Sequence, residues 1–170
     1  MRITPVTPGT QPDLAELEST ITATRGKVGP LYQALLVSPP MCNGWEKMLT
    51  AVRNHNSLPE VLRELLILRV AVLNRCPSEI AAHEPLALTL GASQPQVDAV
   101  HDTTTTPGAG FTEAEQVLLE LADTMTRNIE VPAGLYTRVR AHWDERGIVD
   151  ASVTIAAYSM VTRFIAALEI

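Results

Sequence analysis

The feature that most limits the fold of this chain is a run of apolar residues in its middle, from Leu65 to Leu73, with the sequence LLILRVAVL. A helix that is apolar on almost every face is stable only when other helices surround it. The run follows Leu58-Pro59-Glu60, and proline is well tolerated in the first turn of a helix. We therefore expect a central helix that begins near Glu60.

The rest of the chain also carries the apolar periodicity of helices, and no stretch alternates as a half-buried strand does. Aromatic residues make up only 4% of the 170 residues, which favours helices packed on helices. We predict an all-α, single-domain bundle of about seven to nine helices. Residues 1–11 are expected to form an extended arm and residues 12–170 the helical domain. Thr112 and Glu115 have the spacing of a capping box.

Composition argues against several classes of protein. The net charge is −6, with 13 basic and 19 acidic residues, and no basic stripe suited to nucleic acid is visible. The N-terminus lacks the apolar segment of a secretory signal, and no run approaches the roughly 18 apolar residues that span a bilayer. Two cysteines do not make a disulfide framework. We expect a cytoplasmic protein that binds neither nucleic acid nor membrane.

Four residues with chemically useful side chains lie in and just after the central run. Glu64 stands at its start, where a buried carboxylate would need a partner. Cys76-Pro77 predicts the start of the next helix, with Cys76 as its cap. Cys76, Glu79 and His83 follow at i, i+3 and i+7, the spacing of one helix face. The pattern predicts a site formed by two consecutive helices.

These residue types favour proton transfer, although each also has a structural explanation. A buried carboxylate has a raised pKa, and clustered titratable groups mark active sites more often than chance. Glu79 could instead be a surface partner of His83, and His83 or Cys76 a packed core residue. A thiol at a helix N-terminus is also a candidate nucleophile. Cys42 is expected to fill the core, and the spacing of ligands gives little support for a metal.

The segment RELLILRVAVLNRCPSEIAAHEPLA, residues 63–87, resembles the core motif of the carboxymuconolactone decarboxylase family, which includes the alkylhydroperoxidase D branch. The likeness extends to GPLYQALLVSPPMCNGW and ERGIVDASVTIAAYSMVTRF and so covers most of the chain. The resemblance implies an all-α fold over residues 12–170, a trimer or hexamer, and a site near Glu64, Cys76, Glu79 and His83. The peroxidase branch has a second cysteine where this chain has Glu79, which favours the decarboxylase branch.

We therefore expect an enzyme that needs no cofactor or metal. It would act as a decarboxylase, lyase or isomerase on a small carboxylated or enolisable cyclic compound, with His83 and Glu64 as the proton-transfer pair. The alternatives are a thiol-dependent peroxidase that uses Cys76, an oxygenase or rearrangement enzyme of natural-product metabolism, and a helical scaffold without activity.

Overall fold

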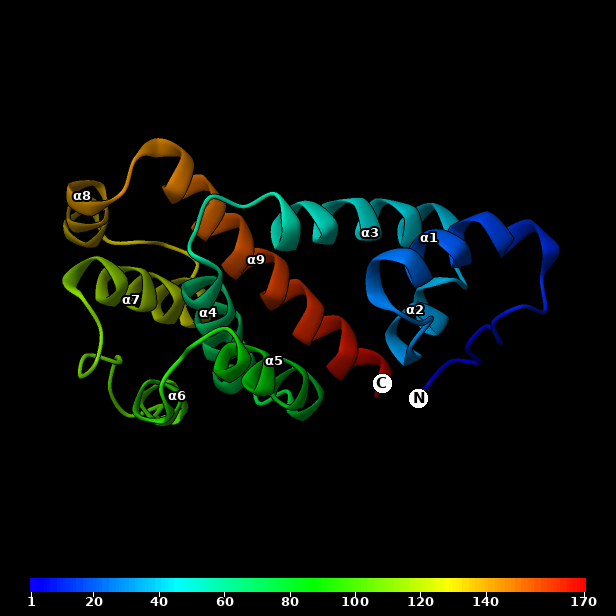
Figure 1. Cartoon of the computed structure of the whole chain (residues 1–170), viewed down its shortest axis with the longest axis horizontal. Helices are drawn as coiled ribbons and strands as arrows, with labels where there is room; N and C mark the ends of the chain where they lie inside the picture. Colours follow the sequence, from blue (N-terminus) through cyan, green and yellow to red (C-terminus); the bar gives the residue numbers. More distant parts are fainter. The chain divides into compact units, whose positions relative to one another are not determined.

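The computed structural model of the chain describes all residues from 1 to 170 and contains only helices (Figure 1). The all-α prediction is confirmed, at the upper end of the expected number of helices. The elements are η1 (Pro12–Leu14), α1 (Ala15–Arg25), α2 (Pro30–Leu35), α3 (Pro39–Asn54), α4 (Glu60–Leu73), α5 (Pro77–Thr89), α6 (Gln94–His101), α7 (Glu113–Arg127), α8 (Ala133–His142) and α9 (Glu145–Leu168).

The helices form two compact units, which we call unit 1 and unit 2. Unit 1 comprises residues 1–56 and 164–170, and unit 2 comprises residues 57–163. The last turns of α9 therefore belong to unit 1 and its longer part to unit 2.

In unit 2, α4 is the central helix, as the sequence predicts. Every residue from Leu62 to Val72 is buried, and α4 packs against α5, α6 and α7. Burying a leucine or isoleucine side chain contributes about 1.5–3 kcal/mol, so the apolar run accounts for much of the core of this unit. The same burial extends to three charged residues of the helix, Arg63, Glu64 and Arg69.

The turn between α4 and α5 reverses the chain within three residues. Arg75 adopts a left-handed conformation with φ of 53°, which is uncommon for a residue with a Cβ atom. Cys76 is the N-cap of α5, as expected, and has an extended conformation with φ of −105° and ψ of 93°. Its carbonyl accepts the amide of Ile80 at 3.1 Å, and Pro77 occupies the first turn. This turn lays α5 against α4.

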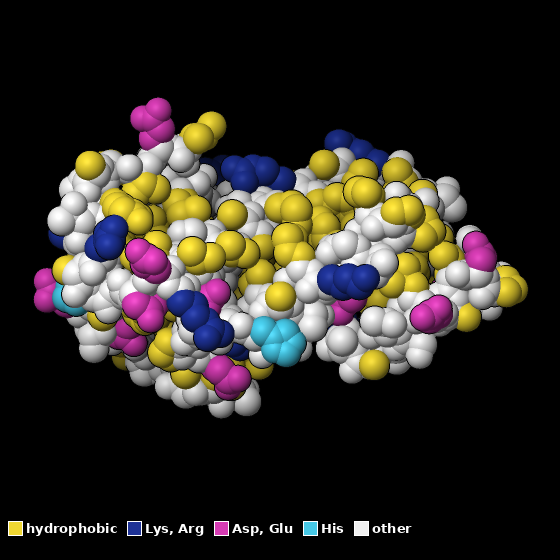
Figure 2. All heavy atoms as spheres, turned by 90° about the horizontal axis from the view of Figure 1, so that it is seen from above, with side chains coloured by type: hydrophobic (Ala, Val, Ile, Leu, Met, Phe, Trp, Pro, Cys, Tyr) yellow, Lys and Arg dark blue, Asp and Glu magenta, His cyan; other side chains and the backbone are white.

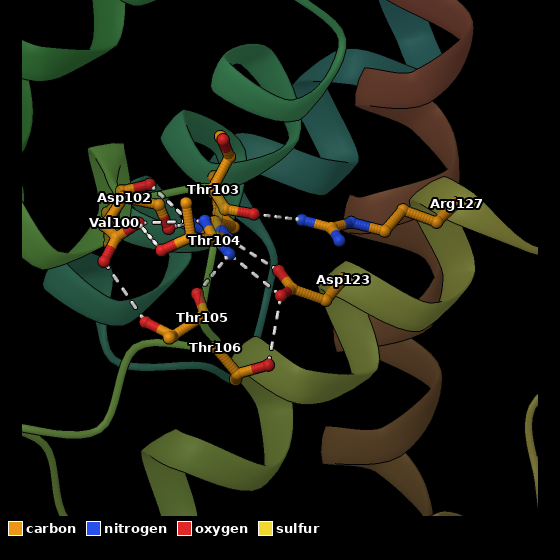
Figure 3. Close-up of polar contacts among 9 residues, drawn as sticks. Val100, Asp102, Thr103, Thr104, Thr105, Thr106, Asp123 and Arg127 are labelled. Carbon is orange, nitrogen blue, oxygen red and sulfur yellow. Dashed lines mark hydrogen bonds and ion pairs between the residues drawn. The ribbon is translucent and has the colours of Figure 1, made fainter.

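The loop between α6 and α7 is held by a buried arginine of α4 (Figure 3). The Arg69 guanidinium donates to the carbonyls of Val100 at 2.8 Å, Asp102 at 2.6 Å and Thr105 at 2.9 Å. It also donates to both carboxylate oxygens of Asp123 on α7, at 2.6 and 2.8 Å. All five N–H groups of this side chain are thus used. The capping box of Thr112 and Glu115, predicted from sequence, begins α7.

Helix α9 is long and apolar enough, by length and composition, to cross a membrane. The expectation that no run of the chain reaches this limit is therefore wrong, because the charged residues of α9 lie towards its ends. Half of its most apolar window is buried inside the protein, which is also the pattern of a core helix. Figure 2 shows hydrophobic side chains gathered in patches between charged ones on one face of the surface.

In unit 1, α1 ends at Gly26, whose positive φ of 80° suits glycine, and α2 begins after Gly29. Residues 1–11 precede the first helical turn, and the amide of Val6 donates to the carbonyl of Gln33 at 2.9 Å. The arm and the domain limits assigned to residues 1–11 and 12–170 stay predictions.

A second buried carboxylate, Glu46 on α3, lies in unit 1 and was not singled out from the sequence. The hydroxyls of Thr24 and Thr50 donate to its Oε1 at 2.6 and 2.7 Å. Arg25 Nε donates to Oε2 at 3.1 Å, and the Tyr32 hydroxyl donates to the same oxygen. Burial alone raises the pKa of Glu46, but these hydrogen bonds and the guanidinium outweigh it and lower the pKa below 4.5. Glu46 is a satisfied ion within the core of unit 1.

Candidate active site

Glu64 and His83 meet inside unit 2. Glu64 lies near the start of α4 and His83 in the middle of α5, and they are 1% and 5% exposed. The Nδ1 atom of His83 and Oε2 of Glu64 are 2.6 Å apart, a short, charge-assisted hydrogen bond. With Glu64 ionised, its carboxylate can only accept, so Nδ1 is the donor in this pair. The predicted convergence of an acid and an imidazole from two consecutive helices is thus present in the structure.

The other ring nitrogen of His83 faces a second carboxylate. Nε2 lies 3.5 Å from Oε2 of Glu79, four residues earlier on α5, and the Glu79 side chain is 12% exposed. Glu79 is therefore not the solvent-facing surface partner that its spacing also allowed. The imidazole stands between two acids, one on each side of the ring.

The two acids determine the protonation of the imidazole. Burial alone would lower the pKa of His83, but the hydrogen bonds to Glu64 and Glu79 and their negative charges more than compensate. The pKa of His83 is therefore raised above 6.5. This shift keeps the imidazolium form populated near neutral pH, where it can donate a proton.

Cys76 is buried at the start of α5, and the hydrogen bond of its sulfur is not with His83. Its one polar contact is with the hydroxyl of Ser78, at 3.6 Å. The reason lies in the cap conformation: Cys76 has an extended backbone, so the helical spacing that aligns Glu79 with His83 does not extend to it. The structure brings Glu64, Glu79 and His83 together through hydrogen bonds and ion pairs, and the role of Cys76 stays a prediction.

Two further residues contact this cluster. The ring of Tyr158, from α9, meets the His83 ring edge-on with centroids 5.0 Å apart. Arg63, which precedes Glu64, places Nε 3.5 Å from Glu64 Oε1. The sequence carries no signal for the contact of Tyr158, which is 75 positions from His83. Arg63 could have been noticed as a charge beside the predicted acid in a helix that must be buried.

Cys42 lies in unit 1 and is fully buried, as expected for a core residue. Burial and the nearby Glu46 carboxylate raise the pKa of its thiol to about 11. Such a thiol is almost entirely protonated at neutral pH and is a poor nucleophile. No group of three or more His, Cys, Asp or Glu side chains is arranged to hold a metal ion.

The sequence matches the model of the Carboxymuconolactone decarboxylase family over residues 39–123, which is half of the chain. This segment includes the four predicted site residues. The uncharacterized protein YdfG of Bacillus subtilis (strain 168) is 30% identical over 102 residues, which cover 59% of this chain and 68% of that protein.

Solved structures with the same fold include proteins described as peroxidase-related and a debrominase. An uncharacterized peroxidase-related protein from Silicibacter sp. TM1040 has a TM-score of 0.81 at 18% identity, and the match covers 98% of this chain and 87% of that protein. A peroxidase-related protein with an alkylhydroperoxidase AhpD core, from Ralstonia eutropha JMP134, has a TM-score of 0.82 at 16% identity, with coverages of 99% and 90%. A cysteine-to-alanine variant of the debrominase Bmp8, in complex with 2,3,4-tribromopyrrole, has a TM-score of 0.81 at 14% identity, with coverages of 99% and 90%. At these identities the likeness concerns the fold alone.

Proposed function

Since the chain belongs to the carboxymuconolactone decarboxylase family, we propose that it is an enzyme that moves a proton on a small cyclic substrate, with His83 as the proton carrier and Glu64 as its partner. The observation that carries the proposal is the buried 2.6 Å hydrogen bond between these two side chains. An imidazole fixed in one tautomer by a carboxylate is the usual arrangement of a general acid or base.

The proposed chemistry is decarboxylation or isomerisation without a cofactor. In a decarboxylation, the bond between the ring carbon and the carboxylate breaks, CO2 leaves, and the electron pair stays on the carbon. His83 in its imidazolium form then gives the Nε2 proton to that carbon. Glu64 keeps the proton of Nδ1 in place, and Glu79, next to Nε2, passes a proton from solvent back to the ring. Positioned acid–base groups of this kind accelerate reactions by about 10²–10⁴-fold.

The test uses a panel of small cyclic acids and enolisable ring ketones in D2O, followed by proton NMR for CO2 loss and for deuterium incorporation. We expect His83→Ala to slow the reaction of any active compound by about 10²–10⁴-fold and Glu64→Gln to slow it strongly, because both disrupt the proton carrier. Cys76→Ala should retain activity. The matched control is His101→Ala, which removes a histidine paired with Glu84 at 2.8 Å on the surface. A full rate in His83→Ala would exclude this mechanism.

Thiol chemistry at Cys76 is the second candidate, and two observations favour it. Cys76 caps the N-terminus of α5, and a debrominase of the same fold was crystallised as a cysteine-to-alanine variant. In this reaction the Cys76 thiolate attacks a hydroperoxide, becomes a sulfenic acid, and needs an external thiol as reductant, since the Cys42 thiol has a raised pKa. Hydroperoxide consumption that requires an added thiol, and that Cys76→Ala abolishes but His83→Ala does not, would select this candidate.

We also propose that the protein acts as a homo-oligomer, a trimer or hexamer, in the cytoplasm. Val149, Val153, Ala156 and Met160 are exposed on α9 and follow one another at steps of four, three and four residues. This spacing is that of a seam between paired helices. Light scattering of the wild type and of Val153→Glu tests the assembly: we expect a smaller particle for the variant, and a monomeric wild type would contradict the proposal.

A further inference from the structure

Arg63, at the edge of the Glu64–His83 pair, is a buried cation whose Nε has no hydrogen-bond partner. The residue is 7% exposed and lies in the first turns of α4. Charged side chains are rarely this buried unless partners compensate the loss of water. A guanidinium has five N–H donors in a rigid plane and keeps its charge at any physiological pH.

Arg63 forms an ion pair with Glu64, but this contact does not satisfy its Nε–H as a hydrogen bond would. Its Nε is 3.5 Å from Oε1 of Glu64, beyond the usual range of an N–H···O hydrogen bond, and Nε is buried without a hydrogen-bond partner. The other oxygen of Glu64 is already bound to His83 at 2.6 Å. The Nε–H of Arg63 is therefore a buried donor that the fold leaves unused.

The same helix contains a direct comparison. Arg69 lies six residues further along α4 and is fully buried, and acceptors at 2.6–2.9 Å use all of its N–H groups. In unit 1, Arg25 likewise donates to Tyr32, Glu46 and Thr50. The fold thus supplies acceptors for every N–H of Arg69, whereas Nε of Arg63 has none. A buried donor without a partner beside a candidate active site is typical of a position that a ligand completes.

We propose that Arg63 binds an anionic group of the substrate, a carboxylate in its simplest form, beside the His83 ring. The inference deepens the proposed function and rests on it for the identification of the bound molecule as a substrate. A carboxylate offers two oxygens at the spacing of the guanidinium fork, so one oxygen can accept from Nε, which the protein leaves without a partner, and the other from the adjacent N–H of the fork. Arg63 thereby selects anionic ring compounds over the neutral enolisable compounds that the acid–base pair alone could accept.

The charges of the cluster are compatible with such a ligand. Arg63 and the imidazolium of His83 carry two positive charges, and Glu64 and Glu79 carry two negative ones, when all four are ionised. A bound carboxylate adds one negative charge, which favours the protonated form of His83. Binding of the substrate therefore also prepares the proposed proton donor, since the imidazolium is the form that gives up a proton.

The test measures binding separately from turnover. The probes are pyrrole-2-carboxylate and benzoate, each compared with its neutral amide, and affinity is measured by isothermal titration calorimetry. We expect the wild type to prefer each carboxylate to its amide. Arg63→Gln should weaken carboxylate binding by about 10- to 100-fold, the range that charge-assisted hydrogen bonds supply, and leave amide binding unchanged. Arg63→Lys keeps the charge without the fork and should fall between the two.

Two controls separate the possible failures. Arg140→Gln removes an exposed positive charge of unit 2 and should bind as the wild type does. His83→Ala should still prefer the carboxylates, and a variant that binds them without turnover shows that the anion site does not depend on His83. If the wild type binds the carboxylates but turns over no compound of the panel, that result counts against the proposed function and not against the anion site. The inference is overturned if the wild type binds acid and amide equally, if neither carboxylate binds at millimolar concentration, or if Arg63→Gln and Arg63→Lys both bind carboxylate as the wild type does.

Discussion

Replacing Asp123 by asparagine should destabilise unit 2 more than any conservative change on its surface. The Asp123 carboxylate accepts two hydrogen bonds from Arg69, at 2.6 and 2.8 Å, and one from the Thr106 hydroxyl at 3.1 Å (Figure 3). Asparagine has nearly the same shape but only one oxygen. Its NH2 group would then face an N–H of the guanidinium, and the positive charge of Arg69 would stay buried without a counter-ion.

The size of the effect follows from this geometry. Removing one partner of a buried ion pair costs about 3–5 kcal/mol because the remaining charge is uncompensated. For a chain of this length each kcal/mol lowers the melting temperature by about 2–4 °C, so the expected decrease is about 6–20 °C. The effect should lie at the lower end of this range, since three carbonyls still accept hydrogen bonds from Arg69.

Differential scanning calorimetry measures the decrease, and Glu120→Gln is the matched control. Glu120 lies on the same helix as Asp123 and pairs with Arg138 at the surface, where ion pairs contribute little. The double variant Arg69→Met/Asp123→Leu should recover only part of the loss, because the carbonyls of the α6–α7 loop lose their donor. If Asp123→Asn melts within 2 °C of Glu120→Gln, the buried pair does not stabilise the fold as argued.

Four further results are expected from pH and labelling. By NMR, His83 should titrate above its usual 6.5, and Glu64→Gln should lower that pKa, since burial alone opposes the charge; an unchanged pKa would contradict the pairing. The stability that His83 contributes is complete below pH 6.5 and is lost as the pH rises through the raised pKa, so His83→Ala should flatten this part of the stability profile. Glu46 behaves oppositely: its contribution is present above pH 4.5 and is lost as the pH falls through the lowered pKa, and chemical denaturation of Glu46→Gln should lack that acid-dependent loss. Cys42, with a pKa of about 11, should react with iodoacetamide at pH 8 far more slowly in the folded protein than in urea, and equal rates would place its thiol in solvent.

The parts of the fold that could be predicted are those that local patterns determine. The apolar run of α4 requires burial whatever surrounds it, and the capping box at Thr112 involves residues three positions apart. The contacts of Arg69 could not be predicted in this way. Its partners lie 31 to 54 residues away, on the loop and on α7, and a charge inside an apolar run does not indicate which distant groups will accept its hydrogen bonds.

The contacts of the candidate site also differ in whether a local pattern could predict them. Glu79 and His83 are four residues apart within α5, so helical geometry alone places them together. The contact of Glu64 with His83 depended on a further inference, that the turn at Cys76-Pro77 folds α5 back onto α4. The spacing also predicts that Cys76 lies with His83, and this part of the site stays a prediction, because Cys76 is a cap residue with non-helical angles.

Helix α4 thus contains three buried charged residues in an otherwise apolar sequence, and the completeness of their hydrogen bonding distinguishes their roles. Arg69 is fully bonded to groups of the fold, which is what a residue that fixes a loop requires. Glu64 is bonded through one oxygen to an imidazole that can change its charge. Arg63 is paired with Glu64 but keeps a buried Nε–H without an acceptor, which a residue that only stabilises the fold does not require. A buried charge that costs stability and stands next to a proton carrier is best explained by what it binds.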